Sequence, residues 1–128
     1  MKIVISIFCL PYEIDELENT LSQLKKSSYH LNDEIEWVLD VTMTVSNKMV
    51  NWDDSTIPQS YFVDKFAKLN TNSDWCVNDF QTSETILGCV SQRRSSLINH
   101  KDADYFIWLD TDIVFDERTL LCFQMAIE

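Results

Sequence analysis

The spacing of hydrophobic positions along the chain changes between two periods. Residues 2–10 form an almost unbroken β-branched and aromatic run, which is typical of a strand covered on both faces. From Glu13 onward, hydrophobic residues recur instead at steps of three and four, which predicts an amphipathic helix ending near Ser28. The hydrophobic face of this helix consists of Ile14, Leu17, Leu21 and Leu24.

The next segments repeat this alternation. Residues 34–45 place hydrophobic side chains at every second position and predict a second strand. The polar residues 46–56 predict a loop, after which Pro58 suits the first turn of a second helix. Residues 74–82 carry a weak pattern for a short third strand. The hydrophobic stripe of the second helix is Phe62, Phe66 and Leu69.

The C-terminal part continues in the same order. Ser83 is a candidate N-cap for a third helix, which ends before Lys101. Residues 104–109 form a compact aromatic and β-branched strand, and residues 117–127 return to a helical pattern. The residues of the third helix that are predicted to face inward are Ile86, Leu87, Val90, Leu97 and Ile98.

This order of strands and helices predicts an α/β fold. Parallel neighbours in a sheet need a crossover that a helix supplies, so we expect three α/β/α layers with a mainly parallel central sheet. No linker, repeat or low-complexity tract interrupts the chain, so residues 1–128 are expected to form a single domain. Ligands of open sheets collect at the carboxyl ends of the strands, so the residues that end strands are the informative ones.

Charge and composition narrow the classes of function. The chain carries 21 acidic and 10 basic residues, a formal charge of -11, which disfavours a protein that holds nucleic acid by neutralising phosphates. No hydrophobic run approaches the roughly 20 residues that a transmembrane segment needs. An acidic helical pattern, rather than a cleavage site, follows residues 2–10, so a buried strand is favoured over a signal peptide. The four cysteines lack zinc-finger spacing, and reduced thiols in a cytoplasmic protein are expected.

Two carboxylates stand directly after the predicted strand 104–109. Asp110 and Asp112 would place two hard oxygen donors where the chain leaves the sheet. A divalent cation could be shared there with the phosphates of a substrate. The alternative is that Asp110 caps a turn and that Asp112 is merely solvated.

Four further charged residues are candidates for ligand binding. Arg93 and Arg94 lie in the predicted third helix, where a guanidinium could pair with phosphate oxygens or hold an aspartate. Adjacent helical residues point about 100° apart, so only one of them is expected to face the site, and a solvated helix face is the alternative. Glu13 and Asp40 could accept hydrogen bonds from a base or a ribose. Glu13 suits a first helical turn equally well, and Asp40 an outward strand position.

These motifs occur in an order that resembles a known family. The order comprises a hydrophobic first strand with Pro11-Tyr12-Glu13, an aspartate on the second strand, Gly88 and Arg93-Arg94 in a helix, and an aromatic strand before Asp110-Thr111-Asp112. It resembles the nucleotide-binding half of a GT-A fold glycosyltransferase of the family 2-like, DxD-containing type. The resemblance implies a Rossmann-like domain and covers nearly the whole chain.

The resemblance also implies an activity. A sugar would be transferred from a nucleotide-diphosphate sugar to an acceptor hydroxyl, with Mn²⁺ or Mg²⁺ bridging the diphosphate. Asp112 would ligate the metal directly, and Asp110 would contact the ribose or reach the metal through water. The implied contacts to the nucleotide sugar are Pro11, Glu13, Asp40, Asp110 and Arg93 or Arg94.

Several alternatives remain beside this hypothesis. Enzymes of the group usually continue with an acceptor half that supplies a catalytic base, and this half is expected to be absent because the chain reaches Glu128 soon after the motif. A nucleotide-sugar-binding module without turnover, a self-associating protein or a subunit completed by another polypeptide would then fit. His30 and His100 lie at predicted helix ends, where interaction with the helix dipole is favoured over catalysis. A haloacid-dehalogenase-like phosphatase would use Asp110 as nucleophile and Asp112 as acid or base.

Overall fold

Strands and helices alternate along the chain in the predicted order. The computed structural model describes residues 1–45, 58–70, 74–83, 89–114 and 116–128. The strands are β1 (Lys2–Cys9), β2 (Glu36–Thr44), β3 (Val77–Ser83) and β4 (Tyr105–Leu109). The helices are α1 (Ile14–Ser28), preceded by the 3-10 turn η1 (Pro11–Glu13), then α2 (Gln59–Leu69), α3 (Cys89–Asn99) and α4 (Thr119–Ile127).

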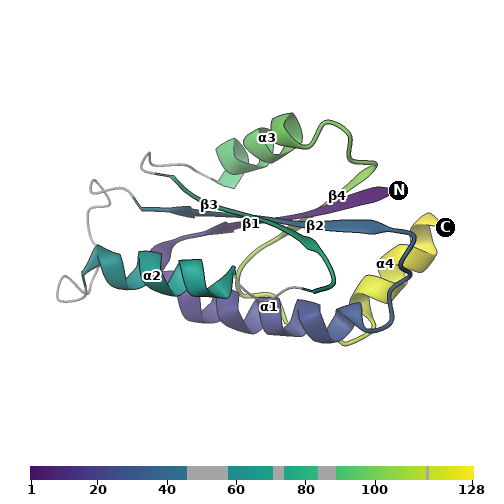
Figure 1. The fold of residues 1–128 in the computed structure, drawn as a ribbon, viewed down its shortest axis with the longest axis horizontal. Helices are drawn as coiled ribbons and strands as arrows, with labels where there is room; N and C mark the ends of the chain where they lie inside the picture. The colour runs from purple at the N-terminus through teal and green to yellow at the C-terminus, as the bar shows by residue number, and fades with distance from the viewer. Residues whose placement is uncertain (46–57, 71–73, 84–88, 115) are drawn as a thin grey trace.

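The strands form an all-parallel sheet in the order β3-β2-β1-β4, which confirms the predicted α/β class (Figure 1). In the middle of the sheet, Ile5 pairs with Leu39 on one side and with Ile107 on the other. β1 and β2 are the central strands, which explains their near-continuous hydrophobic sequences. The order is Rossmann-like, and the direction in which strands are added reverses at β1, because β4 returns to its free side.

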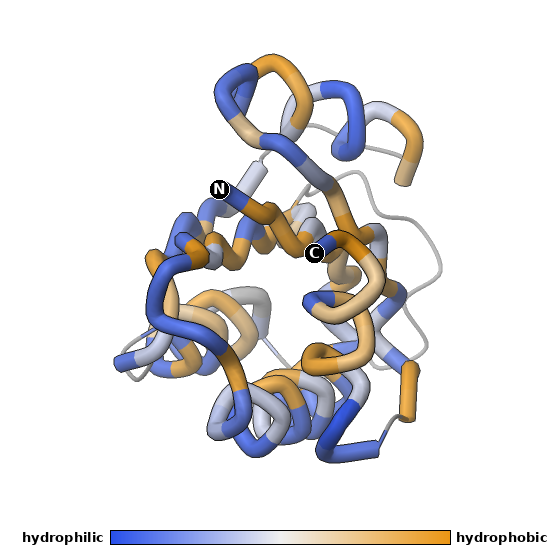
Figure 2. The backbone as a smooth tube through the Cα atoms, turned by 90° about the vertical axis from the view of Figure 1, so that its right-hand side faces the viewer, coloured by the Kyte–Doolittle hydropathy of each residue, from blue (hydrophilic) through white to orange (hydrophobic). Residues whose placement is uncertain are grey.

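Helices cover both faces of the sheet. α1, α2 and α4 lie on one face and α3 lies on the other (Figure 1). The view turned by 90° also shows α3 apart from the other helices (Figure 2). This arrangement agrees with the predicted three layers. Within the residues that the structure describes, none of the helices combines the length and the apolar character needed to cross a membrane.

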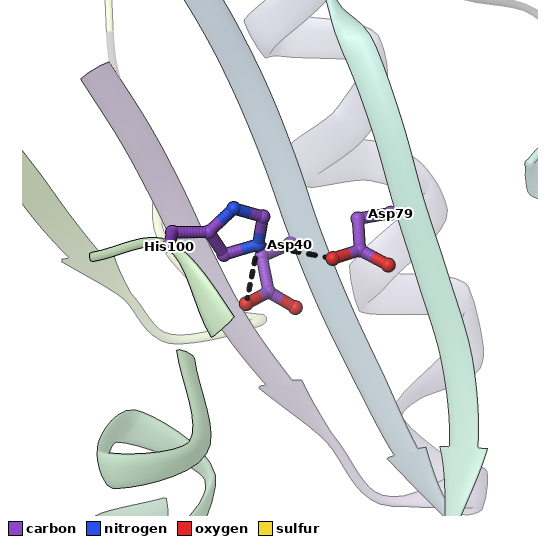
Figure 3. Close-up of side chains that lie close together, drawn as sticks. All are labelled: Asp40, Asp79 and His100. Atoms are coloured by element: carbon purple, nitrogen blue, oxygen red, sulfur yellow. Dashed lines mark hydrogen bonds and ion pairs between the residues drawn. The ribbon is translucent and has the colours of Figure 1, made fainter. Parts of the chain in front are cut away.

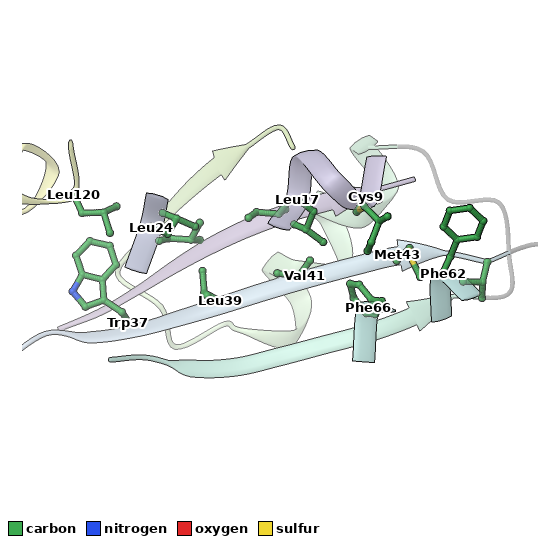
Figure 4. Packing of buried hydrophobic residues seen from close by; sticks show 14 of the residues in the cluster. Cys9, Leu17, Leu24, Trp37, Leu39, Val41, Met43, Phe62, Phe66 and Leu120 are labelled. Carbon is green, nitrogen blue, oxygen red and sulfur yellow. The ribbon is translucent and has the colours of Figure 1, made fainter. Parts of the chain in front are cut away.

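The hydrophobic core lies between the sheet and the three helices α1, α2 and α4 (Figure 4). Leu17 and Leu24 of α1, Phe66 of α2 and Leu120 of α4 pack against alternate residues of the central strands. Burying each large aliphatic side chain stabilises the fold by about 1.5–3 kcal/mol. The strand residues in this core are Ile3, Ile5, Ile7 and Cys9 of β1 and Trp37, Leu39, Val41 and Met43 of β2.

The face of the sheet beneath α3 carries a row of buried polar residues beside the buried Val4 and Val38. The alternation that sends hydrophobic residues into the core sends Ser6, Asp40, Thr42 and Thr44 to this opposite face, where all four are buried. Buried polar groups need hydrogen-bonding partners, so the covering helix has to supply polar side chains.

The orientation of α3 corrects the sequence prediction. Gln92 and Ser96 face the sheet and are buried, whereas Val90, Leu97 and Ile98 are 65%, 45% and 64% exposed. The expectation that these three hydrophobic residues face inward is therefore wrong. The physical reason is the row of buried polar residues on this sheet face, one of which, Ser6, hydrogen-bonds with Gln92.

Two further predictions concern the segments between elements, namely the start of the third helix and the loop after the second strand. Ser83 is the last residue of β3, and its predicted role as a helix cap falls on residues outside the described ones. Part of the predicted third helix, Ile86, Leu87 and Gly88, lies outside the described residues, as does the predicted loop over residues 46–56.

Candidate functional site

A cavity of about 400 Å³ opens at the point where the strand order reverses, and we call it the switch-point cavity. Ligands of open α/β sheets bind outside the carboxyl ends of the strands at such a reversal. The lining comes from the end of β1, from η1 and α1, from the first residue of α3 and from the segment after β4. The lining residues are Phe8, Tyr12, Glu13, Glu16, Cys89, Asp110, Thr111 and Asp112.

The segment after β4 presents its two acids to this cavity. Asp110 and Asp112 are both exposed, whereas Thr111 between them is buried. The Thr20 hydroxyl of α1 donates a hydrogen bond of 2.6 Å to the Thr111 carbonyl oxygen. This buried bond fixes the backbone between the two carboxylates, so the loop is held by the first helix while its acids remain accessible.

Glu13 reaches the same cavity from the end of β1. It is the last residue of η1, and its Oε2 accepts a hydrogen bond of 3.0 Å from the Leu10 backbone N–H. Pro11 begins this turn and is buried, but it does not line the cavity. The turn therefore positions Glu13, and Pro11 acts on the site through the backbone.

Of the two adjacent arginines, Arg93 is the one that faces the cavity acids. Its Nη2 lies 3.8 Å from Asp110 Oδ1, and its guanidinium lies 5.7 Å from the centre of the Trp108 ring. Arg94 is exposed. The Arg93–Asp110 pair is open to solvent, so it contributes at most about 1 kcal/mol to stability, and its main effect is on the position of Asp110.

Four carboxylates make the cavity strongly negative. Burial, with added repulsion from Glu13 and Glu16, raises the pKa of the Cys9 thiol and keeps it protonated. All four cysteines are free; Cys9 is buried and Cys122 is exposed.

The acids of the cavity share its wall, but Glu13, Asp110 and Asp112 are not gathered closely enough to form a preformed three-ligand group.

Asp40 lies elsewhere in the fold. β2 continues to Thr44, so Asp40 occupies the middle of the strand on the α3 face, in agreement with the alternative of a simple strand position. The side chain does not line the switch-point cavity. The structure thus brings Glu13, Asp110, Asp112 and Arg93 to one region and leaves Asp40 outside it.

Asp40 instead forms a group with Asp79 and His100 (Figure 3). His100 Nε2 lies 2.9 Å from Asp79 Oδ2 and 3.4 Å from Asp40 Oδ2. One ligand atom from each residue falls within 4.8 Å of the other two, so the group could hold a metal ion. This is a second site on the molecule, on the polar face of the sheet.

Strand register and helix spacing build this second site. Ser6, Asp40 and Asp79 lie side by side on β1, β2 and β3. Gln92 and Ser96 follow one another by four residues, which places them on one side of α3. Gln92 Nε2 donates a hydrogen bond of 2.8 Å to Ser6 Oγ, and His100 follows the helix by the same step to meet the two aspartates.

The charge of Asp40 is costly in this position. Burial raises the pKa of its carboxyl, the Asp79 carboxylate raises it further, and the Ser96 hydroxyl and His100 lower it. Asp40 Oδ1 accepts a hydrogen bond of 3.2 Å from Gln81 Nε2. Asp40 Oδ2 is buried and has no hydrogen-bond partner among the described residues.

A larger cavity, of about 750 Å³, lies between α1 and α2. Hydrophobic residues of the core form much of its wall, including Leu39 and Phe80. On its rim, Lys65 lies 3.7 Å from Glu18 and also binds Asp15 outside the cavity. It lies away from the carboxyl ends of the strands, so size alone does not make it the better candidate.

The sequence analysis missed Asp79 and His100 as functional candidates. Asp79 lies in a segment whose strand pattern is weak, and His100 was assigned to interaction with a helix dipole. The available signal was the spacing of Gln92, Ser96 and His100, which marks a polar helix face opposite a strand that carries Asp40.

The arrangement offers two kinds of chemistry. The switch-point cavity provides carboxylates next to an arginine, and the face beneath α3 provides two carboxylates and an imidazole around one point.

Comparison of the chain with protein-family models, with curated proteins and with solved structures finds no significant match to any of them.

Proposed function

We propose that the chain binds a nucleotide-diphosphate sugar at the switch-point cavity through a divalent cation, in the manner of a GT-A glycosyltransferase. The observation that carries the proposal is the convergence of Glu13, Asp110 and Asp112 on one cavity at the reversal of strand order. These residues come from the ends of two neighbouring strands, where an open sheet receives its ligands.

The donor set suits Mn²⁺ or Mg²⁺. Both are bound through carboxylate oxygens and complete their coordination with water and substrate phosphates. Arg93 already pairs with Asp110, so Asp112 is the better candidate for direct ligation. Asp110 would then contact the ribose or act through water.

The resemblance suggests transfer of a sugar from a nucleotide-diphosphate sugar to an acceptor hydroxyl, with the nucleoside diphosphate as the leaving group. A bound cation would stabilise the negative charge that develops on this leaving group. Arg93 would hold the phosphates or keep Asp110 oriented, and Glu13 would accept hydrogen bonds from the nucleoside through the oxygen that Leu10 does not occupy. The base, the sugar, the acceptor and the catalytic base are left unassigned.

A second candidate function is a binding subunit that another polypeptide completes. The outer side of α3 supports it, because three hydrophobic residues of this short helix face solvent. These residues are Val90, Leu97 and Ile98. A partner that covers them would lie on the same helix that carries Arg93, next to the proposed site.

The phosphatase alternative has less support. An aspartate nucleophile of that class works beside a lysine, and no lysine lines the switch-point cavity in the part of the chain that the structure describes.

The test is thermal unfolding with uridine or guanosine diphosphate, with and without Mn²⁺. A ligand that binds only the folded state stabilises it, by about 2.7 kcal/mol at a hundred times its Kd. We expect a metal-dependent rise in Tm for the wild type and its loss in Asp112→Asn. Asp33→Asn, a substitution at an exposed aspartate outside the cavity, is the matched control.

Two outcomes would contradict the proposal. One is a wild-type protein that none of the nucleotides stabilises at saturating Mn²⁺. The other is a folded Asp112→Asn variant that binds the metal-nucleotide as tightly as the wild type. Transfer or hydrolysis of a labelled nucleotide sugar then separates an enzyme from a binding module.

A further inference from the structure

We propose that Asp40, Asp79 and His100 bind one zinc ion on the face of the sheet that α3 covers. This site is independent of the proposed nucleotide site, because none of its three residues lines the switch-point cavity. It draws its ligands from β2, from β3 and from the residue that follows α3 (Figure 3).

The spacing of the ligand atoms is close to that around a tetrahedral ion, with all three atoms within 4.8 Å of one another. Zinc lies about 2.0–2.1 Å from nitrogen and oxygen ligands, which places neighbouring ligands roughly 3.3 Å apart. His100 Nε2 is 3.4 Å from Asp40 Oδ2 and 2.9 Å from Asp79 Oδ2. A small outward shift of the Asp79 side chain, which is 38% exposed, would open the space for the ion.

A proton alone does not satisfy this group. A single N–H on His100 Nε2 serves the hydrogen bond to Asp79, and Asp40 Oδ2 is left buried without a hydrogen-bond partner among the described residues. The Asp40 side chain is fully buried, and its Oδ2 lies 3.4 Å from His100 Nε2, so a charged carboxylate in this place is costly. A divalent cation in place of the shared proton would bind all three atoms at once.

The surroundings hold one ligand in place. Gln81 Nε2 donates hydrogen bonds to Asp40 Oδ1 at 3.2 Å and to Thr42 Oγ1 at 2.9 Å, so the second oxygen of Asp40 is directed at the site. Such outer contacts orient metal ligands and raise affinity. Solvent reaches the group on the Asp79 side, where water or a small ligand would complete the coordination.

The ligand set favours zinc over the ions proposed for the other site. Mg²⁺ and Mn²⁺ favour sites made of oxygen donors, whereas an imidazole nitrogen with two carboxylates suits a borderline ion such as zinc. The ion would join the end of α3 to β2 and β3. It would therefore stabilise the contact between this helix and the sheet.

The experiment is a titration of the chelator-stripped protein with Zn²⁺, followed by calorimetry and by thermal unfolding. We expect one ion per chain and a rise in Tm that Mg²⁺ at the same concentration does not produce. His100→Gln and Asp79→Asn are expected to weaken binding by more than about tenfold, since each removes a direct ligand. His30→Gln, at the other histidine, should bind as the wild type does.

Two further measurements make the result specific. Co²⁺ in place of Zn²⁺ should give a tetrahedral visible spectrum without a thiolate charge-transfer band, because no cysteine takes part. Asp112→Asn should keep the zinc affinity, so failure of the nucleotide site and failure of this one are told apart. Circular dichroism checks that Asp79→Asn is folded, since this residue is only partly buried.

Three results would overturn the proposal. They are a stripped wild-type protein that takes up no zinc, unchanged affinity in folded Asp79→Asn and His100→Gln, and a cobalt spectrum dominated by thiolate ligands.

Discussion

Single side chains on the polar face of the sheet decide how α3 binds. Gln92 and Ser6 are each 2% exposed and are joined by a hydrogen bond of 2.8 Å. Neither can be hydrated where it lies, so each depends on the other. The bond is a specific link between α3 and the central strand β1.

This dependence predicts an asymmetric mutational effect. Gln92→Leu leaves the buried Ser6 hydroxyl without this partner, and we expect the free energy of unfolding to fall by about 1–3 kcal/mol. Urea unfolding measures the change. Adding Ser6→Ala should restore part of the loss, because both polar groups are then removed together.

The double variant is the control for this argument. If the two single losses simply add, the two side chains are not coupled and the hydrogen bond carries no interaction energy.

At the scale of elements, α3 is oriented oppositely to the sequence prediction. Helix α1 was predicted correctly because Leu17 and Leu24 meet a hydrophobic sheet face. The residues of α3 were assigned by the same rule, yet the sheet face beneath this helix carries Asp40 and Ser6. Which face of a helix is buried depends on the chemistry of the surface it meets.

Substitutions on the two helices should therefore behave differently. Ile98→Lys on the outer side of α3 should change stability by no more than about 0.5 kcal/mol, because the side chain is exposed. Leu17→Ala in α1 should cost about 2–5 kcal/mol, since it leaves a cavity in the core. Equal losses in the two variants, measured by urea unfolding, would contradict the observed orientation of α3.

The fold class and part of the candidate site could be predicted from the sequence, whereas the group around Asp40 could not. The parallel α/β order and the common location of Glu13, Asp110 and Asp112 follow from hydrophobic periods and from the rule that ligands meet strand ends. The grouping of Asp40 with Asp79 and His100 depends on the strand register and on the rotation of α3. Neither quantity is encoded in a local pattern, so this part of the molecule required the structure.

At the scale of the whole molecule, acidic charge dominates. The formal charge of -11 makes the folded chain repel itself, and four carboxylates are concentrated at one cavity. Buried Asp40 adds to this penalty, because burial raises its pKa from the ordinary value of 3.8.

We expect the chelator-treated protein to lose stability as the pH rises through the raised pKa of Asp40. With a raised pKa, the folded state binds the Asp40 proton more tightly than the unfolded state does, so this contribution is lost as the pH rises from about 3.8 through the raised value. The exposed carboxyl of Asp102 has the opposite sign, because its hydrogen bond with Lys2 lowers its pKa. Its contribution is lost only as the pH falls below about 3.8, outside this interval.

Urea unfolding at a series of pH values from about 3.8 upward tests this dependence. Asp40→Asn should flatten the profile, since the amide does not titrate. A variant that keeps the full pH dependence of the wild type would show that Asp40 does not contribute to it.

The position of β4 at the border of the sheet has one more consequence. Its pairing with β1 leaves its other side without a neighbour among the described strands, and such a border exposes backbone groups that can pair with an incoming strand. A parallel strand added there would end beside Asp110 and Asp112. A strand that widens the sheet at β4 would therefore also place its own last residues beside the acidic cavity.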